Sequence, residues 1–274
     1  MADRGLVPPP WVGDLLGRGE RFRLASVRVP GVIALDRAEF HDATVLAYRR
    51  LETELRGGPA LHPVRLWNHI PRIHEVLGDG LDRYKVFNAG RFEALSQWFG
   101  GNESFDTRVA SASGIGHDGE DLVVHCLAAD HRGRPVVNPR QIAPYRYSCK
   151  FGPKPPCFAR ATVIHPDGGG PLVLVGGTAS IVGEESVHLG DLARQMEETL
   201  TNLAALLREA AGKPASLAGF RELRVYHPDP DQRCELRRLL EDAVGDQVPI
   251  EWVRADLCRR ELLVEIEGVA ALDG

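Results

Sequence analysis

Apolar positions in the C-terminal half of the chain alternate between strand-like and helix-like spacing. Residues 171–177 form a short apolar run that ends in two glycines, which is typical of a buried strand and its exit. Leucines then recur at helical spacing over residues 191–211, where Asp191 can cap the start of a helix and Gly212 can stop it. Further along, the pattern predicts a strand at 221–227, a second helix from Asp229 to Gly245, and strands at 249–256 and 261–267.

The N-terminal half gives the same order of elements. Its pattern predicts a strand pair at 21–35, a helix at 42–55, a strand at 63–70, a helix at 82–98, and strands at 107–115 and 121–129. The two halves match element for element, though not residue for residue, which indicates a duplicated unit of a sheet with two helices on one face. We therefore expect an α+β fold with an N-terminal half at 1–137 and a C-terminal half at 161–274.

Residues 138–160 separate the two halves and have no clear periodicity. A flexible linker is expected to be polar and poor in aromatic residues. This segment instead combines several prolines with Tyr145, Tyr147, Phe151 and Phe158. We expect a packed crossing segment and not a free linker.

Charge and cysteine spacing exclude several classes of protein. The formal net charge is −5, and no nucleic-acid partner is expected because phosphate binding needs a basic surface. The five cysteines show no CxxC spacing, and His62, His69 and His74 form no HxH or HxxxH pair, so we expect neither a disulfide framework nor a metal site. The chain shows no signal-peptide pattern and no apolar run of membrane-spanning length, which predicts a cytoplasmic protein without a membrane partner.

A stretch of the C-terminal half resembles the RidA/YjgF family. The run GGTASIVGEESVHLGDLARQMEETLTNLAALLREAAGK shares that family's glycines after a strand. It also shares a helix with Gln, then Asn-Leu, then Ala-Gly, here Gln195, Asn202-Leu203 and Ala211-Gly212. The ending LLVEIEGVA resembles the family's last strand. The resemblance implies a RidA-like, chorismate-mutase-like fold for this half.

Four motifs, in order, resemble the chorismatase family. They are RLWNHIPRIHE, RYKVFNAGR, APYRYSCKFGPKPPCFARA and GGTASIVGEESVH, and they cover most of residues 62–212. Members of that family are built from two RidA-like halves, in agreement with the duplication predicted from the hydrophobic pattern. The chain departs from the family pattern at His69, where a Tyr is usual, and at Glu184, where a His usually precedes the key Glu.

The resemblance implies an enzyme that cleaves the enol ether of chorismate, or of a close analogue, to pyruvate and a cyclic carboxylic acid without a cofactor. The expected ring product is 3-hydroxybenzoate or a dihydroxycyclohexadiene carboxylate. Glu185 matches the family's catalytic Glu, and Arg91 and Arg160 match its carboxylate-binding arginines. Because a duplicated chain can form within itself the cleft that RidA trimers form between subunits, a monomer is preferred over a trimer.

Cleaving an enol ether requires a proton to be delivered to its terminal methylene carbon. A carboxyl group can deliver it near neutral pH only if burial or a neighbouring negative charge raises its pKa. Glu185 follows the predicted strand end and could face a cleft, and the adjacent Glu184 offers a route to a raised pKa if both face inward. Two acidic residues shortly before a helix could equally serve the helix N-terminus alone.

Four further residues are weaker candidates for substrate contacts. Tyr84 and Tyr145 could hydrogen-bond a carboxylate or a hydroxyl group, although core packing is equally expected for both. Thr178 could hold a water or a substrate hydroxyl, or could simply fill a turn. Arg146 could assist in binding or could pair with an acid elsewhere.

Two other functions stay open at this point. A RidA-type imine deaminase would have an Arg just before the penultimate strand, and residues 247–250 contain none. The second alternative is a non-catalytic relative that binds a small carboxylate ligand, because His69 and Glu184 alter the family pattern.

Overall fold

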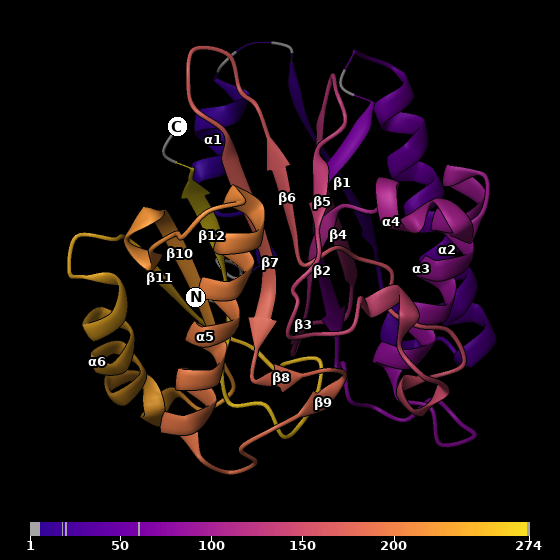
Figure 1. Ribbon diagram of the computed structural model, residues 1–274. Helices are drawn as coiled ribbons and strands as arrows, with labels where there is room; N and C mark the ends of the chain where they lie inside the picture. The colour runs from indigo at the N-terminus through magenta and orange to yellow at the C-terminus, as the bar shows by residue number, and fades with distance from the viewer. Residues whose placement is uncertain (1–5, 18, 20, 60, 273–274) are drawn as a thin grey trace.

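The computed structural model describes residues 6–272 except residues 18, 20 and 60. Its N-terminal part contains α1 (Trp11–Leu16), β1 (Phe22–Val29), α2 (Arg37–Arg56), β2 (His62–Pro71), α3 (Arg83–Phe99), α4 (Phe105–Arg108), β3 (Ser111–His117) and β4 (Leu122–Ala129). The four strands form a sheet of order β1-β4-β2-β3, in which β2 and β3 run parallel and the other pairs antiparallel. Helices α2 and α3 cover its outer face (Figure 1).

The second sheet has the order β11-β10-β12-β7-β6-β5. Its elements are β5 (Arg134–Val136), β6 (Ala161–Ile164), β7 (Leu172–Ala179), α5 (Leu192–Ala211), β10 (Phe220–His227), α6 (Arg233–Val244), β11 (Ile250–Arg254) and β12 (Glu265–Ala271). Helices α5 and α6 cover the outer face of this sheet (Figure 1). A separate pair, β8 (Ile181–Val182) and β9 (Glu185–Ser186), follows β7. The α+β class and the two helices on each sheet confirm the predicted fold.

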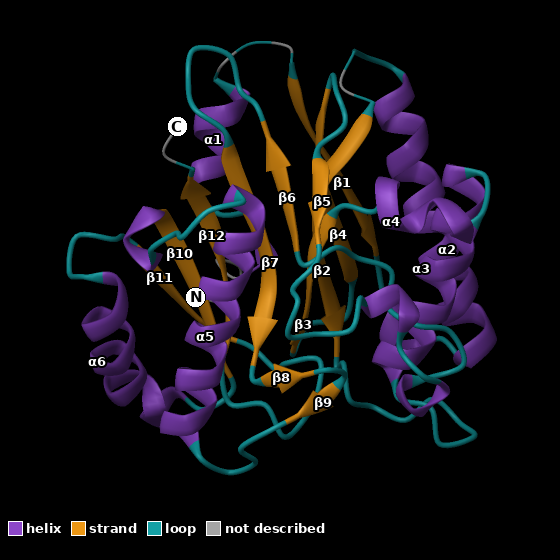
Figure 2. Ribbon diagram, viewed as in Figure 1, coloured by secondary structure: helices purple, strands orange, loops and turns teal. Residues whose placement is uncertain are grey.

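The two sheets face each other between the two groups of helices, as Figure 2 shows. An apolar cluster fills part of the space between them, with Trp67 from the first sheet and Leu174 from the second among its buried members. At Gly176 the sheets meet so closely that a Cβ would lie 2.7 Å from the carbonyl oxygen of Ala112 on β3. This close approach explains one of the two adjacent glycines, because a glycine inside a strand marks a place where another backbone comes near.

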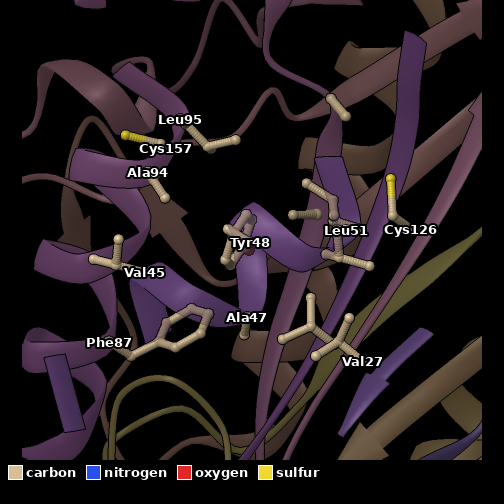
Figure 3. Close-up of a cluster of buried hydrophobic side chains, with 14 of the residues drawn as sticks. Val27, Val45, Ala47, Tyr48, Leu51, Phe87, Ala94, Leu95, Cys126 and Cys157 are labelled. Atoms are coloured by element: carbon tan, nitrogen blue, oxygen red, sulfur yellow. The ribbon is translucent and has the colours of Figure 1, made fainter. Parts of the chain in front are cut away.

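Each sheet also has an apolar core under its own helices. In the N-terminal half, Tyr48 and Leu51 of α2 and Phe87 of α3 pack against strand residues such as Val27 and Cys126 (Figure 3). A second cluster joins α5 and α6 to β7, β10 and β12. The duplication therefore gives two helix-on-sheet cores and a third core between the sheets.

The helix ends follow local sequence signals. The side chain of Asp191 accepts a hydrogen bond from the Arg194 amide at 3.0 Å, and Gly212 ends α5 in a left-handed conformation with φ of 65°. Helix α2 begins earlier than predicted, because Asp36 and Glu39 form a reciprocal capping box ahead of it. No described helix has the length and apolar character needed to cross a membrane.

Several predicted strand boundaries were wrong. Residues 21–35 hold one strand, β1, followed by a short 3-10 turn, so the predicted strand pair is absent from that range. β3 begins at Ser111 because residues 105–108 form α4. Residues 261–264 precede β12 as a loop, in which Leu262 is buried with Leu257 and not within a strand. In each case a short helix, turn or loop carries buried apolar side chains, and hydrophobic periodicity alone does not distinguish such a segment from a strand.

Segment 138–160 is packed, as predicted. Its Tyr145 and Phe158 pack against the N-terminal core, and Cys157 is fully buried in it. The second sheet extends to both sides of the segment, because β5 at residues 134–136 pairs with β6 after it. The segment therefore leaves the second sheet after β5 and returns to it at β6, and in between it packs side chains onto the N-terminal core.

Replacing Asp191 with Ala should reduce the free energy of unfolding by about 1 kcal/mol, because the Arg194 amide at the start of α5 loses its acceptor. We expect the Tm to fall by about 2–4 °C in thermal unfolding followed by circular dichroism. Glu197→Ala, at an exposed position of the same helix, is the matched control and should change the Tm little. Equal Tm values for the two variants would contradict the capping role.

Candidate active site

A cavity of about 310 Å³ lies between the two halves of the chain. Helix α3 and strand β3 contribute side chains from the N-terminal half, while β7, β12 and the loop before β12 contribute from the C-terminal half. Segment 138–160 supplies the aromatic side chains of Tyr147, Phe151 and Phe158. The volume is at the lower end of the range of small-molecule sites.

One buried carboxyl group lines this cavity. Glu265 is the first residue of β12, and 4% of it is exposed. Burial, with a further contribution from Glu267, raises the pKa of the Glu265 carboxyl to about 8, against the opposing charges of Arg65 and Arg160. Glu265 is therefore mostly protonated at neutral pH and can act as a proton donor.

Space for the Glu265 carboxyl comes from Gly177 on the neighbouring strand β7. A Cβ at Gly177 would overlap Oε1 of Glu265 and lie 2.7 Å from its Cδ. Val175 and Thr178 of β7 pair with Gly268 and Ile266 of β12, so β7 has one more residue than β12 between the two pairs. This extra residue makes a β-bulge. The glycines predicted to form a turn after the strand therefore lie within it, and Gly177 leaves the room in which the carboxyl group sits.

Two buried guanidinium groups line the same cavity. Arg91 on α3 is 1% exposed and donates to Oδ1 of Asn88 at 2.9 Å, while Arg160, just before β6, is 3% exposed and donates to Oη of Tyr147 at 2.5 Å. The Nε–H of each has no hydrogen-bond partner among the described residues. Because a buried cation needs an anionic partner, the pair is suited to binding a carboxylate ligand.

Aromatic rings hold these cations in place. The ring centroid of Phe158 lies 5.7 Å from Cζ of Arg91 and 5.4 Å from Cζ of Arg160. A third cation of the cavity, Arg259, has its Cζ 4.0 Å from the ring centroid of Phe151. Cation–π contacts of this kind orient the guanidinium groups without neutralising their charge.

Tyr84 on α3 also lines the cavity. Burial raises the pKa of its hydroxyl, so the group stays protonated and can donate a hydrogen bond to a ligand oxygen. Gly114 on β3 leaves space beside it, since a Cβ there would lie 3.2 Å from Cε2 of Tyr84. Tyr84, Arg91 and Arg160 are thus the predicted substrate-binding residues that the structure brings together.

Three other predicted residues lie outside the cavity lining. Tyr145 packs edge-to-face on Phe105, with ring centroids 6.3 Å apart, and belongs to the N-terminal core. Arg146 is exposed beside Tyr145. Thr178 is buried, donates to the carbonyl oxygen of Gly176 at 3.0 Å, and is not part of the cavity lining.

The structure does not place Glu185 in the cavity lining. Its side chain is 53% exposed and forms an ion pair with Lys150 at the surface. The carboxylate of Glu184 accepts hydrogen bonds from the amide and hydroxyl of Ser148, and these bonds lower the pKa of Glu184. Both side chains therefore lie at the surface, and the condition for a raised pKa, that both face inward, is not met.

Glu265, Tyr147 and Arg259 are site residues that the sequence reasoning did not identify. A signal was present for Glu265: the run ELLVEIE places Glu265 and Glu267 at alternate positions among apolar residues. Acidic residues are rarely fully buried unless they are paired. Two of them on one face of a buried strand therefore indicate a functional or paired site.

His69, which stands where the family usually has a Tyr, lies between the sheets and outside the cavity lining. The His69 side chain is buried, and its ring centroid lies 5.6 Å from that of His125 in an edge-on arrangement. Burial lowers the pKa of His69 well below its usual value, so the ring is neutral. In the described part of the chain, no group of His, Cys, Asp or Glu side chains is placed to hold a metal ion.

The cavity combines a buried carboxyl group with the guanidinium groups of Arg91 and Arg160, which have no carboxylate partner among the described residues, and this arrangement suits a small anionic ligand. A family model described as "Chorismatase FkbO/Hyg5-like, N-terminal" matches residues 18–128. A 3-hydroxybenzoate synthase of Streptomyces hygroscopicus is 35% identical over 261 residues, which cover 92% of this chain and 74% of that protein. A chorismatase of Streptomyces rapamycinicus is 34% identical over 224 residues, covering 78% of this chain and 65% of the relative.

A solved chorismatase structure superposes with a TM-score of 0.82 at 28% sequence identity, covering 92% of this chain and 75% of that one. The chain belongs to the chorismatase family. The resemblance recognised in the four sequence motifs is thereby confirmed.

The raised pKa of Glu265 should make stability depend on pH. Because the folded-state pKa of about 8 exceeds the ordinary value of 4.5, the stability associated with the protonated carboxyl is fully present below pH 4.5 and is lost as pH rises through 8. Glu265→Gln removes this loss. We expect the free energy of unfolding of the variant, relative to wild type, to rise by up to a few kcal/mol between pH 5 and pH 9.

Urea unfolding at pH 5, 7 and 9 measures this difference. Glu185→Gln is the matched control, since it makes the same change of side chain at an exposed position. Parallel pH dependences for wild type and Glu265→Gln would show that the Glu265 carboxyl is not held in its neutral form.

Proposed function

We propose that the cavity binds chorismate or a close dicarboxylate analogue and cleaves its enol ether, with Glu265 as the general acid. The observation that carries the proposal is a buried carboxyl group, protonated at neutral pH, in a cavity that also holds the guanidinium groups of Arg91 and Arg160. Arginine suits such a ligand because its planar fork can bind a carboxylate bidentately. The names of the relatives, chorismatase and 3-hydroxybenzoate synthase, support this substrate class.

In the first step the Glu265 carboxyl gives its proton to the terminal methylene carbon of the enol ether, which leaves an oxocarbenium ion. A water molecule then adds to the cationic carbon and returns one proton to the Glu265 carboxylate, which regenerates the acid. The resulting hemiketal collapses: its hydroxyl group loses a proton and becomes the ketone of pyruvate, the bond between that carbon and the ring oxygen breaks, and the ring oxygen takes up a proton and remains on the ring as a hydroxyl group. The residues require no cofactor for these steps, because each is a proton transfer or the addition of water.

The ring product depends on whether water is also lost from the ring. Cleavage alone gives a dihydroxycyclohexadiene carboxylate, and further loss of one water gives 3-hydroxybenzoate. We favour 3-hydroxybenzoate, which the name of the 35% identical relative supports.

The cavity walls and the free cysteines bear on the oligomeric state and on the cellular compartment. Both walls of the cavity come from one chain, which supports a monomer in preference to a RidA-like trimer. The free state of Cys126, Cys149, Cys157, Cys234 and Cys258 supports a reducing cytoplasm as the compartment. Both statements stay predictions.

The decisive experiment compares Glu265→Gln with Glu185→Gln in a pyruvate-release assay on chorismate. Glu265→Gln should reduce kcat by at least about 100-fold, because the amide has no acidic proton to give. Glu185→Gln, which changes an exposed side chain paired with Lys150, should stay within about threefold of wild type. Chromatography of the ring product identifies which acid is released.

The reverse result, with Glu185→Gln inactive and Glu265→Gln active, would restore the role predicted for Glu185 from the family motif. If wild type releases no pyruvate but binds chorismate tightly, the protein is a binding protein and the proposed reaction is wrong. Circular dichroism of both variants confirms that activity is compared between folded proteins.

A further inference from the structure

A second carboxyl group lies beneath the cavity on the same strand as the acid. Glu267 is 1% exposed and follows Glu265 by two positions on β12, so the two side chains project from the same face of the sheet. Glu267 is not part of the cavity lining. The steps proposed for enol ether cleavage make no use of it, although burying it requires several dedicated partners.

Three donors surround the Glu267 carboxylate. Nη2 of Arg65, fully buried on β2, donates to Oε2 of Glu267 at 2.6 Å, and Nε1 of Trp67 donates to Oε1 at 2.9 Å. The hydroxyl of Ser113 donates to the same Oε2. A carboxylate that accepts bonds from a guanidinium, an indole and a hydroxyl group is stabilised in its charged form.

Ser113 joins this network to the cavity. Its hydroxyl lines the cavity and also accepts a hydrogen bond from Nη2 of Arg65 at 2.6 Å. A Cβ at Gly177, which would overlap the Glu265 carboxyl, would lie 3.2 Å from Oγ of Ser113. Ser113 therefore contacts the Glu267 carboxylate and lies beside the space that the Glu265 carboxyl group fills.

The other charged groups near Glu265 favour its ionised form. Arg65 from β2 and Arg160 ahead of β6 are both cations. Tyr84 from α3 faces the acid, and Sγ of Cys258 lies 4.0 Å from Oε2 of Glu265, but burial raises the pKa of both groups and keeps them neutral. Around Glu267 the further groups are the cation Arg224 and the protonated Tyr226, both on β10. Among the described residues that face Glu265, Glu267 supplies the opposing negative charge.

We propose that Glu267 is a positioning residue for the reaction: its fixed negative charge, held by Arg65, Trp67 and Ser113, keeps the neighbouring Glu265 in the acid form although cations surround it. The proposal rests on the proposed function, in which Glu265 is the proton donor. The positive charges of Arg65 and Arg160 favour loss of the proton from Glu265, and the negative charge of Glu267 offsets them. Burial is the largest cause of the raised pKa of Glu265, and the charge of Glu267 adds to it against the opposing charges of Arg65 and Arg160.

The test is the pH dependence of kcat/KM for pyruvate release from chorismate by wild type, Glu267→Gln and Glu267→Asp. Glu267→Gln should move the upper pH limit of activity downward by at least about one pH unit, since a nearby charge shifts a carboxyl pKa by about one to three units. Glu267→Asp retains the charge and should retain most of the wild-type limit. A purely structural role predicts lower activity at every pH with the limit unchanged, and that result would overturn the proposal.

Glu267→Gln leaves the Arg65 charge buried without its partner, which can prevent folding. The pH dependence is then compared between Arg65→Met and Arg65→Met with Glu267→Gln. Removal of the Glu267 charge in this background should again lower the upper pH limit. Equal limits in Arg65→Met and in Arg65→Met with Glu267→Gln would count against the proposal. Wild-type activity together with an inactive Glu265→Gln variant shows in parallel that the proposed function holds, so failure of the positioning role is recognised separately.

Discussion

Burial of one carboxyl group between two facing sheets is the constraint on which the site depends. A charged carboxylate would be costly there, so Glu265 keeps its proton at neutral pH. The position exists because β12 runs in the middle of the second sheet, between β10 and β7, and begins at the cavity. Gly177 on β7 then leaves the volume that the carboxyl group fills.

The two halves of the duplicated fold contribute different chemistry to the cavity. The N-terminal half supplies Tyr84 and Arg91 from α3, at one wall. The C-terminal half supplies Glu265 from a strand at the opposite wall, and the crossing segment supplies aromatic rings that hold Arg91 and Arg160. The fold repeats one unit, but the cavity is asymmetric because each half places different side chains in its lining.

The exposed and the buried acidic residues near the cavity differ in their contact with water and in their partners. Glu184 and Glu185 meet hydrogen-bond donors and a lysine at the surface, where water also stabilises their charge. Glu265 and Glu267 are withdrawn from water, and donors from Arg65 and Trp67 surround Glu267, whereas Glu265 has no comparable set among the described residues. The two buried acids therefore differ in their hydrogen-bond partners, and burial raises the pKa of Glu265.

The sequence by itself determined the features that rest on local interactions. Asp191 and Gly212 bound α5 as predicted, because a cap needs only its own helix. The aromatic content of 138–160 likewise predicted a packed segment. Which carboxyl group would be buried was decided only by the tertiary structure. Burial of Glu265 depends on strands and loops that are distant in the chain, whereas the motif around Glu185 carries no information about the water that surrounds it.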